Sequence, residues 1–171
     1  LESARPAPGS CPTPPSPLAA ASLAQTIGHG GVALEPRVVA AVTKDKDVLW
    51  KDDSPPRMLR RAVRPETATE VTRMMLQTVS NGSAFKSFHD ASGKAYLPDI
   101  AVAGKTGTLS DHEANRHYTW FVGFAPAHKP QVAVSALVVN TAAWQIKAPQ
   151  LARDSLRAYF AKAGRKGVTS P

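Results

Sequence analysis

The chain has 171 residues, of which 43% are hydrophobic, enough for one domain with a hydrophobic core. It carries 21 lysines and arginines against 13 aspartates and glutamates, and the net charge of +8 favours a polyanionic neighbour. No recognisable nucleic-acid motif accompanies the scattered basic residues, so we expect no nucleic-acid partner. The single Cys11 excludes an internal disulfide bond, and no apolar run approaches the roughly 20 residues of a membrane span.

The N-terminal part divides into a linker and a helix. Five prolines among small residues make residues 1–15 a Pro-rich disordered linker. Ser16 can cap a helix that carries Pro17 at its first position and ends at Gly28. The G-H-G-G that follows is interpreted as a helix end and turn, because no strand precedes it and no lysine follows in the register of a phosphate loop.

Short β-prone runs and a second helix follow. Residues 37–43 and 47–51 flank a charged turn, which predicts a hairpin. Residues 52–64 are basic and contain prolines, so they are expected to form a surface loop. Pro65 opens a helix for which Thr67 and Glu70 could form a capping box, and Asn81-Gly82 ends it.

Residues 101–108 read A-V-A-G-K-T-G-T, and a lysine, two threonine hydroxyls and a glycine fall within the last four positions. In a strand, Thr106 and Thr108 point to one face while Lys105 and Gly107 belong to the other. Gly107 lets another backbone approach closely, as an edge strand that binds an extended peptide requires. A peptide-binding edge with an anion site is one interpretation. A strand that runs into a glycine-containing turn is the other.

The C-terminal third predicts two more strands and a helix. Residues 118–125 and 131–140 are apolar on both faces, which is typical of strands inside a sheet. A helix from Pro149 to Gly164 could cover one face, followed by a basic tail at residues 165–171. His112, Glu113 and His117 lack the spacing of a zinc helix, so no metal is assigned. The fold class is α+β, an antiparallel sheet flanked by helices.

The order of these motifs resembles the C-terminal part of a penicillin-binding protein transpeptidase domain. G-K-T-G-T is followed by W-F-V-G-F-A-P at residues 120–126, and the helix that begins at Ser16 precedes both in the expected order. The resemblance covers residues 16–164. It implies a partial transpeptidase fold that lacks its N-terminal strands and its nucleophile helix.

The resemblance also implies roles for four residues. Lys105 would be catalytic, supporting proton transfer and the electrostatics around the nucleophilic serine. Thr106, Gly107 and Thr108 would bind substrate: the two hydroxyls hold its carboxylate, and the Thr108 N–H contributes to the oxyanion hole. The implied ligands are a peptidoglycan stem peptide ending in D-Ala-D-Ala and β-lactams, and no cofactor is expected. The parent domain would be a serine-type D,D-transpeptidase or D,D-carboxypeptidase.

The sequence departs from the family pattern in three respects. It contains no S-x-N triplet, and its one S-x-x-K, Ser83 to Lys86, follows a helix end instead of opening a buried helix. Ser83 is therefore interpreted as part of a turn rather than as the nucleophile. The family's first strands are also missing, which would leave the strand at 131–140 with a bare edge. We expect this chain to be a fragment that the remainder of its own transpeptidase domain completes.

The sequence is compatible with three functions from different classes. The first is a transpeptidase fragment for peptidoglycan cross-linking, with the acyl-enzyme on a serine outside this chain. The second is a noncatalytic penicillin-binding-like module that binds peptide or a protein partner. The third, a basic nucleic-acid-binding module, has no motif in its favour. The first implies an extracytoplasmic location, in the periplasm or on the outer face of the cytoplasmic membrane, with an anchor in sequence not present here.

Overall fold

A computed structural model describes residues 15–111, 115–141 and 143–166. The linker assigned to residues 1–15 and the tail assigned to 165–171 therefore lie largely outside the described residues. The elements in chain order are α1 (Pro17–Gly28), β1 (Val32–Leu34), β2 (Ala41–Lys44), β3 (Asp47–Lys51), β4 (Met58–Arg61), α2 (Pro65–Ser80), α3 (Phe85–Phe88), β5 (Ala103–Asp111), β6 (Arg116–Ala125), β7 (Val132–Asn140) and α4 (Ala148–Lys166).

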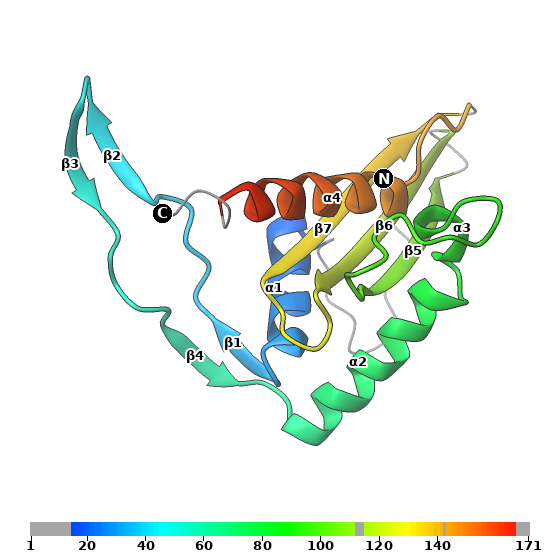
Figure 1. Ribbon diagram of the computed structural model, residues 1–171, viewed down its shortest axis with the longest axis horizontal. Coiled ribbons are helices and arrows are strands. Elements are labelled where there is room, and N and C mark those ends of the chain that lie inside the picture. Colours follow the sequence, from blue (N-terminus) through cyan, green and yellow to red (C-terminus); the bar gives the residue numbers. More distant parts are fainter. Residues whose placement is uncertain (1–14, 112–114, 142, 167–171) are drawn as a thin grey trace.

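The core of the fold is an antiparallel sheet in the order β5-β6-β7 (Figure 1). Thr106 faces Phe121 in the β5-β6 ladder, and Phe121 faces Ala136 in the β6-β7 ladder. In the described part of the chain β5 and β7 are the two edges of this sheet. The expected bare edge is thus present on β7, and the α+β fold class is confirmed.

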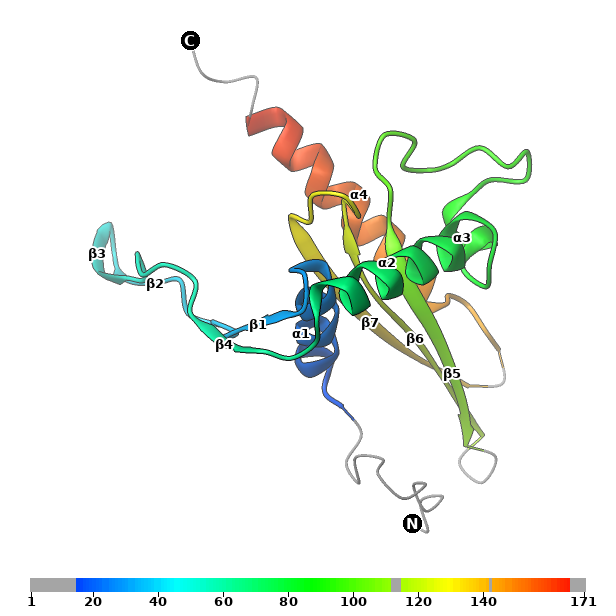
Figure 2. The ribbon, with the colours of Figure 1, turned by 90° about the horizontal axis from the view of Figure 1, so that it is seen from below.

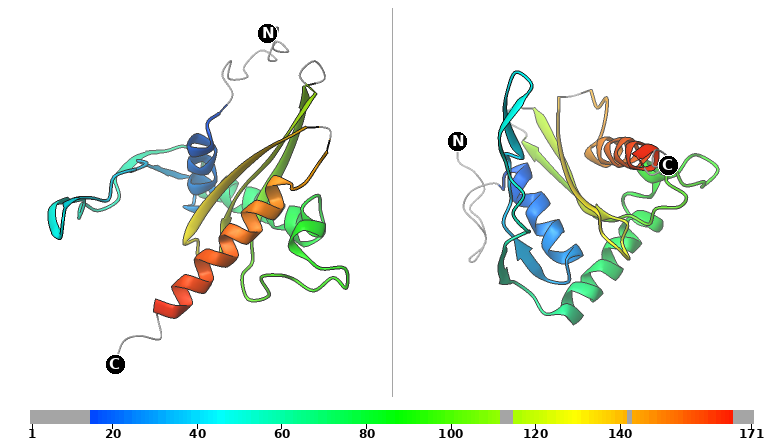
Figure 3. Two further views of the ribbon diagram at one scale, coloured as in Figure 1. Left: turned by 90° about the horizontal axis from the view of Figure 1, so that it is seen from above. Right: turned by 60° about the vertical axis from the view of Figure 1, so that its left-hand side comes forward.

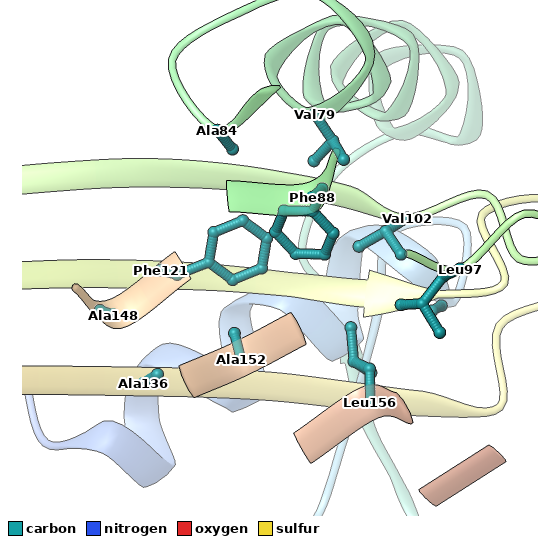
Figure 4. Packing of buried hydrophobic residues seen from close by; sticks show 11 residues of the cluster. Val79, Ala84, Phe88, Leu97, Val102, Phe121, Ala136, Ala148, Ala152 and Leu156 are labelled. Atoms are coloured by element: carbon teal, nitrogen blue, oxygen red, sulfur yellow. The ribbon is translucent and has the colours of Figure 1, made fainter. Parts of the chain in front are cut away.

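Helices cover both faces of the sheet. Figure 3 shows α1 on one side of the sheet and α4 on the other. Phe121 and Leu156 lie in the apolar cluster under α4, and Phe124 lies in the cluster under α1. Figure 4 shows the first cluster, in which the Phe121 ring packs beside Phe88 of α3 with ring centroids 5.3 Å apart. Burial on both faces explains why β6 and β7 are apolar at nearly every position.

Helix α1 begins and ends where the sequence predicts. Ser16 accepts a hydrogen bond from the Ala19 N–H at 3.2 Å, and Pro17 is the first helical residue. Gly30 and Gly31 have positive φ angles of 63° and 89°, which confirms the turn after the helix. This turn places β1 beside α1, where the Gln25 side-chain amide bonds the backbone of Val32 and Leu34.

An extended arm separates α1 from α2. The predicted hairpin is confirmed as β2 and β3, with Asp45 at φ 53° in its turn. The expectation of a loop at 52–64 is wrong in part, because β4 pairs with β1 at the base of the arm. That pairing joins segments far apart in sequence, which local patterns do not reveal. Figures 1 and 2 show the arm extending away from the sheet, and every residue of β2, β3 and β4 is exposed.

One helix cap and one helix end differ from the prediction. Helix α2 starts at Pro65 as predicted, but the capping box at Thr67 and Glu70 is wrong, because no side chain caps the helix at Arg64. Helix α4 continues through Gly164 to Lys166, since an interior glycine costs a helix only about 1 kcal/mol and need not end it. Across the described ranges, no helix combines the length and hydropathy that crossing a bilayer requires.

Candidate active site

The K-T-G-T sequence lies on the edge strand β5. Thr106 and Thr108 face Phe121 and Thr119 of β6, whereas Lys105 faces Val122 on the alternate side of the ladder. Thr106 and Thr108 line one pocket, as the alternation predicts. Because β5 pairs with β6 along one side only in the described part of the chain, its outer backbone is open to an added strand.

The pocket beside β5 has a volume of about 430 Å³ and is formed by three parts of the chain. Strands β5 and β6 form one wall, the turn into α3 forms the second, and the segment before α4 forms the third. Its lining residues are Gly82, Ser83, Lys86, Ser87, Thr106, Gly107, Thr108, Thr119, Trp120, Trp144, Lys147 and Pro149. Hydroxyls, ammonium groups and the Trp144 indole therefore meet in one space, a combination suited to a ligand with both anionic and apolar parts.

Ser83 lies inside this pocket and not merely near it. Its Oγ is 2.6 Å from the Thr106 Oγ1, so the two hydroxyls form a hydrogen bond between the turn and the edge strand. Ser83 precedes the four-residue helix α3, and Lys86 lies within that helix. The S-x-x-K residues are thus positioned by a turn, as the sequence suggests. Sequence reasoning did not foresee that this turn would contact K-T-G-T.

Lys105 points away from the pocket that the two threonines line. Its Nζ donates a hydrogen bond to the backbone oxygen of Thr106 at 2.7 Å, and the residue is exposed. It shares its face of β5 with Ala103, which packs in the cluster under α1. The ammonium and the threonine hydroxyls therefore lie on opposite faces of the edge strand.

The two glycines of this strand serve different purposes. A Cβ added at Gly104 would overlap the Phe121 ring, so glycine is required there by the packing of the core. A Cβ added at Gly107 would meet only the Trp120 Cβ, at 3.4 Å. Nothing in the described part of the chain requires glycine at position 107. A glycine at this position is therefore suited to the close approach of a molecule or chain segment outside the described residues.

The third wall of the pocket was not predicted. Thr119 is 3% exposed and accepts a hydrogen bond from the Ala148 N–H at 3.0 Å, which fixes the start of α4 against β6. Asn140 donates to the Ile146 oxygen at 3.0 Å and holds the preceding segment. These contacts bring Trp144 and Lys147 to the pocket, although residues 141–147 show no helical or strand periodicity that could have indicated it.

The described residues contain no group of three or more histidines, cysteines or acids that could hold a metal ion. His117 lies in β6, where its Nδ1 is 3.0 Å from the Ser110 Oγ. His112 and Glu113, the other residues considered for a zinc helix, lie outside the described residues. Asp111 and Arg116 form the last pair of the β5-β6 ladder.

An antiparallel sheet covered by helices, with K-T-G-T on its edge strand beside a pocket, defines a domain of the penicillin-recognising class. The chain belongs to the family of the penicillin binding protein transpeptidase domain, which residues 10–157 match. It is 35% identical over 130 residues to the peptidoglycan D,D-transpeptidase PbpA of Mycobacterium tuberculosis, a match that covers 74% of this chain and 24% of the relative. It is 29% identical over 137 residues to penicillin-binding protein H of Bacillus subtilis, covering 72% of this chain and 18% of that protein.

Solved structures agree with this assignment. The imipenem acyl-enzyme complex of penicillin-binding protein A from M. tuberculosis superposes with a TM-score of 0.68 at 29% identity, covering 89% of this chain and 32% of that one. The D,D-transpeptidase domain of a peptidoglycan glycosyltransferase from Eggerthella lenta superposes with a TM-score of 0.67 at 29% identity, covering 84% of this chain and 31% of that one. The chain therefore spans about a third or less of the proteins it resembles.

Proposed function

We propose that this chain is the C-terminal portion of a D,D-transpeptidase that cross-links peptidoglycan through an acyl-enzyme. The observation that carries the proposal is the position of Thr106 and Thr108 on an open sheet edge, lining one pocket. An extended stem peptide ending in D-Ala-D-Ala can add to such an edge by backbone pairing, and a β-lactam can take its place. Its carboxylate would accept hydrogen bonds from the two hydroxyls.

The other residues of the motif take complementary roles. Gly107, where no described side chain needs the space, admits the ligand backbone. The Thr108 N–H would be an oxyanion-hole donor, a role worth about 3 to 4 kcal/mol in transition-state stabilisation. Lys105, on the opposite face of β5, would support proton transfer at the nucleophile. That geometry supports a nucleophile approaching the edge from the α1 side, while the carboxylate lies on the α4 side.

The nucleophile itself lies outside this chain in this proposal. Ser83 donates to or accepts from Thr106 and sits in a turn before a helix of four residues. The family's S-x-x-K serine instead begins a helix, and its S-x-N partner does not occur in these 171 residues. The remainder of the transpeptidase domain would supply both. It would also supply strands that pair with the open edge of β7.

A noncatalytic module that binds peptide or a protein partner is the alternative, and upstream sequence without S-x-x-K and S-x-N would favour it. The proposed transpeptidase function takes a cell-wall peptide as its ligand, which implies an extracytoplasmic site of action. Transpeptidase, carboxypeptidase and β-lactamase outcomes share the same acyl-enzyme and differ in the acceptor that reaches it.

The proposal is tested on the full polypeptide that contains this chain, with its upstream sequence. The protein is incubated with benzylpenicillin, and the adduct is located by intact mass and peptide mapping. We expect one adduct on a serine outside these residues. An adduct on Ser83 would contradict the turn interpretation, and a folded protein without any adduct would support the noncatalytic module.

A further inference from the structure

Two lysines share the pocket with Thr106 and Thr108. Lys86 comes from α3 and Lys147 immediately precedes α4, so they reach the pocket from different elements. Among the described residues that line the pocket, none is acidic. The ion pairs seen in the described ranges also leave both lysines out. Two ammonium groups that line one pocket repel each other. An anion bound between them would replace this repulsion with attraction to both charges.

The backbone of Lys147 is held in place. Its N–H donates to the Gln150 Oε1 at 2.8 Å, while the neighbouring Ala148 N–H donates to the buried Thr119 hydroxyl. Asn140 holds the Ile146 oxygen on the other side. Three hydrogen bonds in three consecutive residues therefore fix the position from which the Lys147 side chain extends, which lowers the entropy lost when it binds a ligand.

An aromatic wall lies next to this ammonium group. The Lys147 Nζ is 5.2 Å from the centroid of the Trp144 ring, and the His117 ring is 5.0 Å from the same indole. The Trp120 side chain projects from the same face of the sheet as Gly107, away from the threonine hydroxyls, so Trp144 supplies the indole beside Lys147. A ligand that carries an apolar or aromatic group beside an anionic group would contact both the Trp144 ring and the Lys147 ammonium group.

The position of Lys86 is set by contacts between α3 and α4. Arg153 of α4 donates to the Ser87 backbone oxygen at 2.8 Å, and its guanidinium stacks over the Tyr96 ring at 4.5 Å. The Arg153 side chain is only 16% exposed. Helix α4 also begins directly after Lys147. The same helix therefore fixes the backbone positions of both Lys86 and Lys147.

We propose that Lys86 and Lys147 form an anion subsite that selects acyl donors with a second carboxylate, in addition to the one that Thr106 and Thr108 hold. This inference rests on the proposed function and adds the substrate class. The preferred donor is dicarboxylic, with its second carboxylate beside an apolar group that packs on Trp144. The lysines act as positioning residues for the ligand and take no part in proton transfer.

Benzylpenicillin and carbenicillin provide a matched pair of probes. Carbenicillin is the same molecule with one more carboxylate on the carbon that bears the phenyl ring. The second-order acylation rate constant is measured for both in the full polypeptide, and the quantity compared is the carbenicillin-to-benzylpenicillin ratio. We expect Lys147→Gln and Lys86→Gln each to lower this ratio by up to about fivefold, and the double variant to lower it further. Lys147→Arg retains the charge and should restore the ratio.

Lys129→Gln is the control, because Lys129 is exposed and does not line the pocket. A ratio that stays at the native value in the double variant overturns the subsite while leaving the proposed function intact. Absence of acylation by benzylpenicillin contradicts the proposed function instead. In that event tryptophan fluorescence titration with the two probes decides: tighter binding of carbenicillin that the double variant abolishes supports the subsite, and equal binding overturns it.

Discussion

The side-chain oxygens of Ser83 and Thr106 lie 2.6 Å apart and join the turn before α3 to the edge strand β5. This hydrogen bond orients one of the two hydroxyls that are proposed to hold the ligand carboxylate. We expect Ser83→Ala to reduce benzylpenicillin acylation about three- to tenfold, the loss of one ordinary hydrogen bond. Thr106→Val should reduce it more, by about 10- to 100-fold, since a bond to a charged group is also lost. A loss of three orders of magnitude in Ser83→Ala would mark Ser83 as the nucleophile.

Gly104 and Gly107 offer a matched pair of substitutions. Gly104→Ala forces a methyl group against the Phe121 ring and should lower the free energy of unfolding by about 1 to 3 kcal/mol. The methyl group of Gly107→Ala meets only an ordinary contact near Trp120, so this variant should change the free energy of unfolding by less than about 1 kcal/mol. Urea unfolding measures both. Gly107→Ala should nevertheless slow β-lactam acylation, because the methyl group blocks the ligand backbone; an unchanged rate would argue against that role.

The core and the arm should differ sharply in their contribution to stability. Phe121 is fully buried between β5, α3 and α4, so Phe121→Ala should cost about 3 to 5 kcal/mol of unfolding free energy. Trp50 of β3 is 48% exposed and faces Val42 on the arm, so Trp50→Ala should cost less than about 1 kcal/mol. Thermal unfolding of both variants provides the measurement. A large loss in Trp50→Ala would show that the arm packs against another part of the protein.

Asp90 predicts a pH dependence of stability. The Ser92 hydroxyl donates to the Asp90 Oδ1 at 2.7 Å, and the Lys94 N–H donates to it at 3.0 Å. These bonds lower the pKa of the Asp90 carboxyl below its ordinary 3.8. A lowered folded-state pKa means that this stabilisation is present above pH 3.8 and is lost as the pH falls from there through the folded value.

The variant Asp90→Asn tests this assignment. The difference in unfolding free energy between native protein and variant should be largest near neutral pH and should shrink below pH 4. Urea titrations at a series of pH values measure it. A difference that stays constant from neutral to acid pH would show that the carboxylate charge of Asp90 does not stabilise its turn.

Much of the fold follows from local sequence. Ser16, Pro17 and the Gly30-Gly31 turn define α1, and the two-residue alternation on β5 brings Thr106 and Thr108 to the same pocket. Apolar residues on both faces identify β6 and β7 as interior strands. These features depend on the conformational preferences of neighbouring residues, which a single stretch of sequence carries in full.

The remaining features depend on contacts between distant segments. The pairing of β1 with β4, the bond between Ser83 and Thr106 across 23 residues, and the bond between Thr119 and Ala148 across 29 leave no local pattern. Lys86, Trp144 and Lys147 therefore reach the pocket only once α3 and α4 pack on the sheet. Sequence by itself determined the strand that carries K-T-G-T and the face of that strand on which the threonine hydroxyls lie. Tertiary packing alone decided which residues lie opposite the hydroxyls, because packing is set by the summed burial of many residues far apart in the chain.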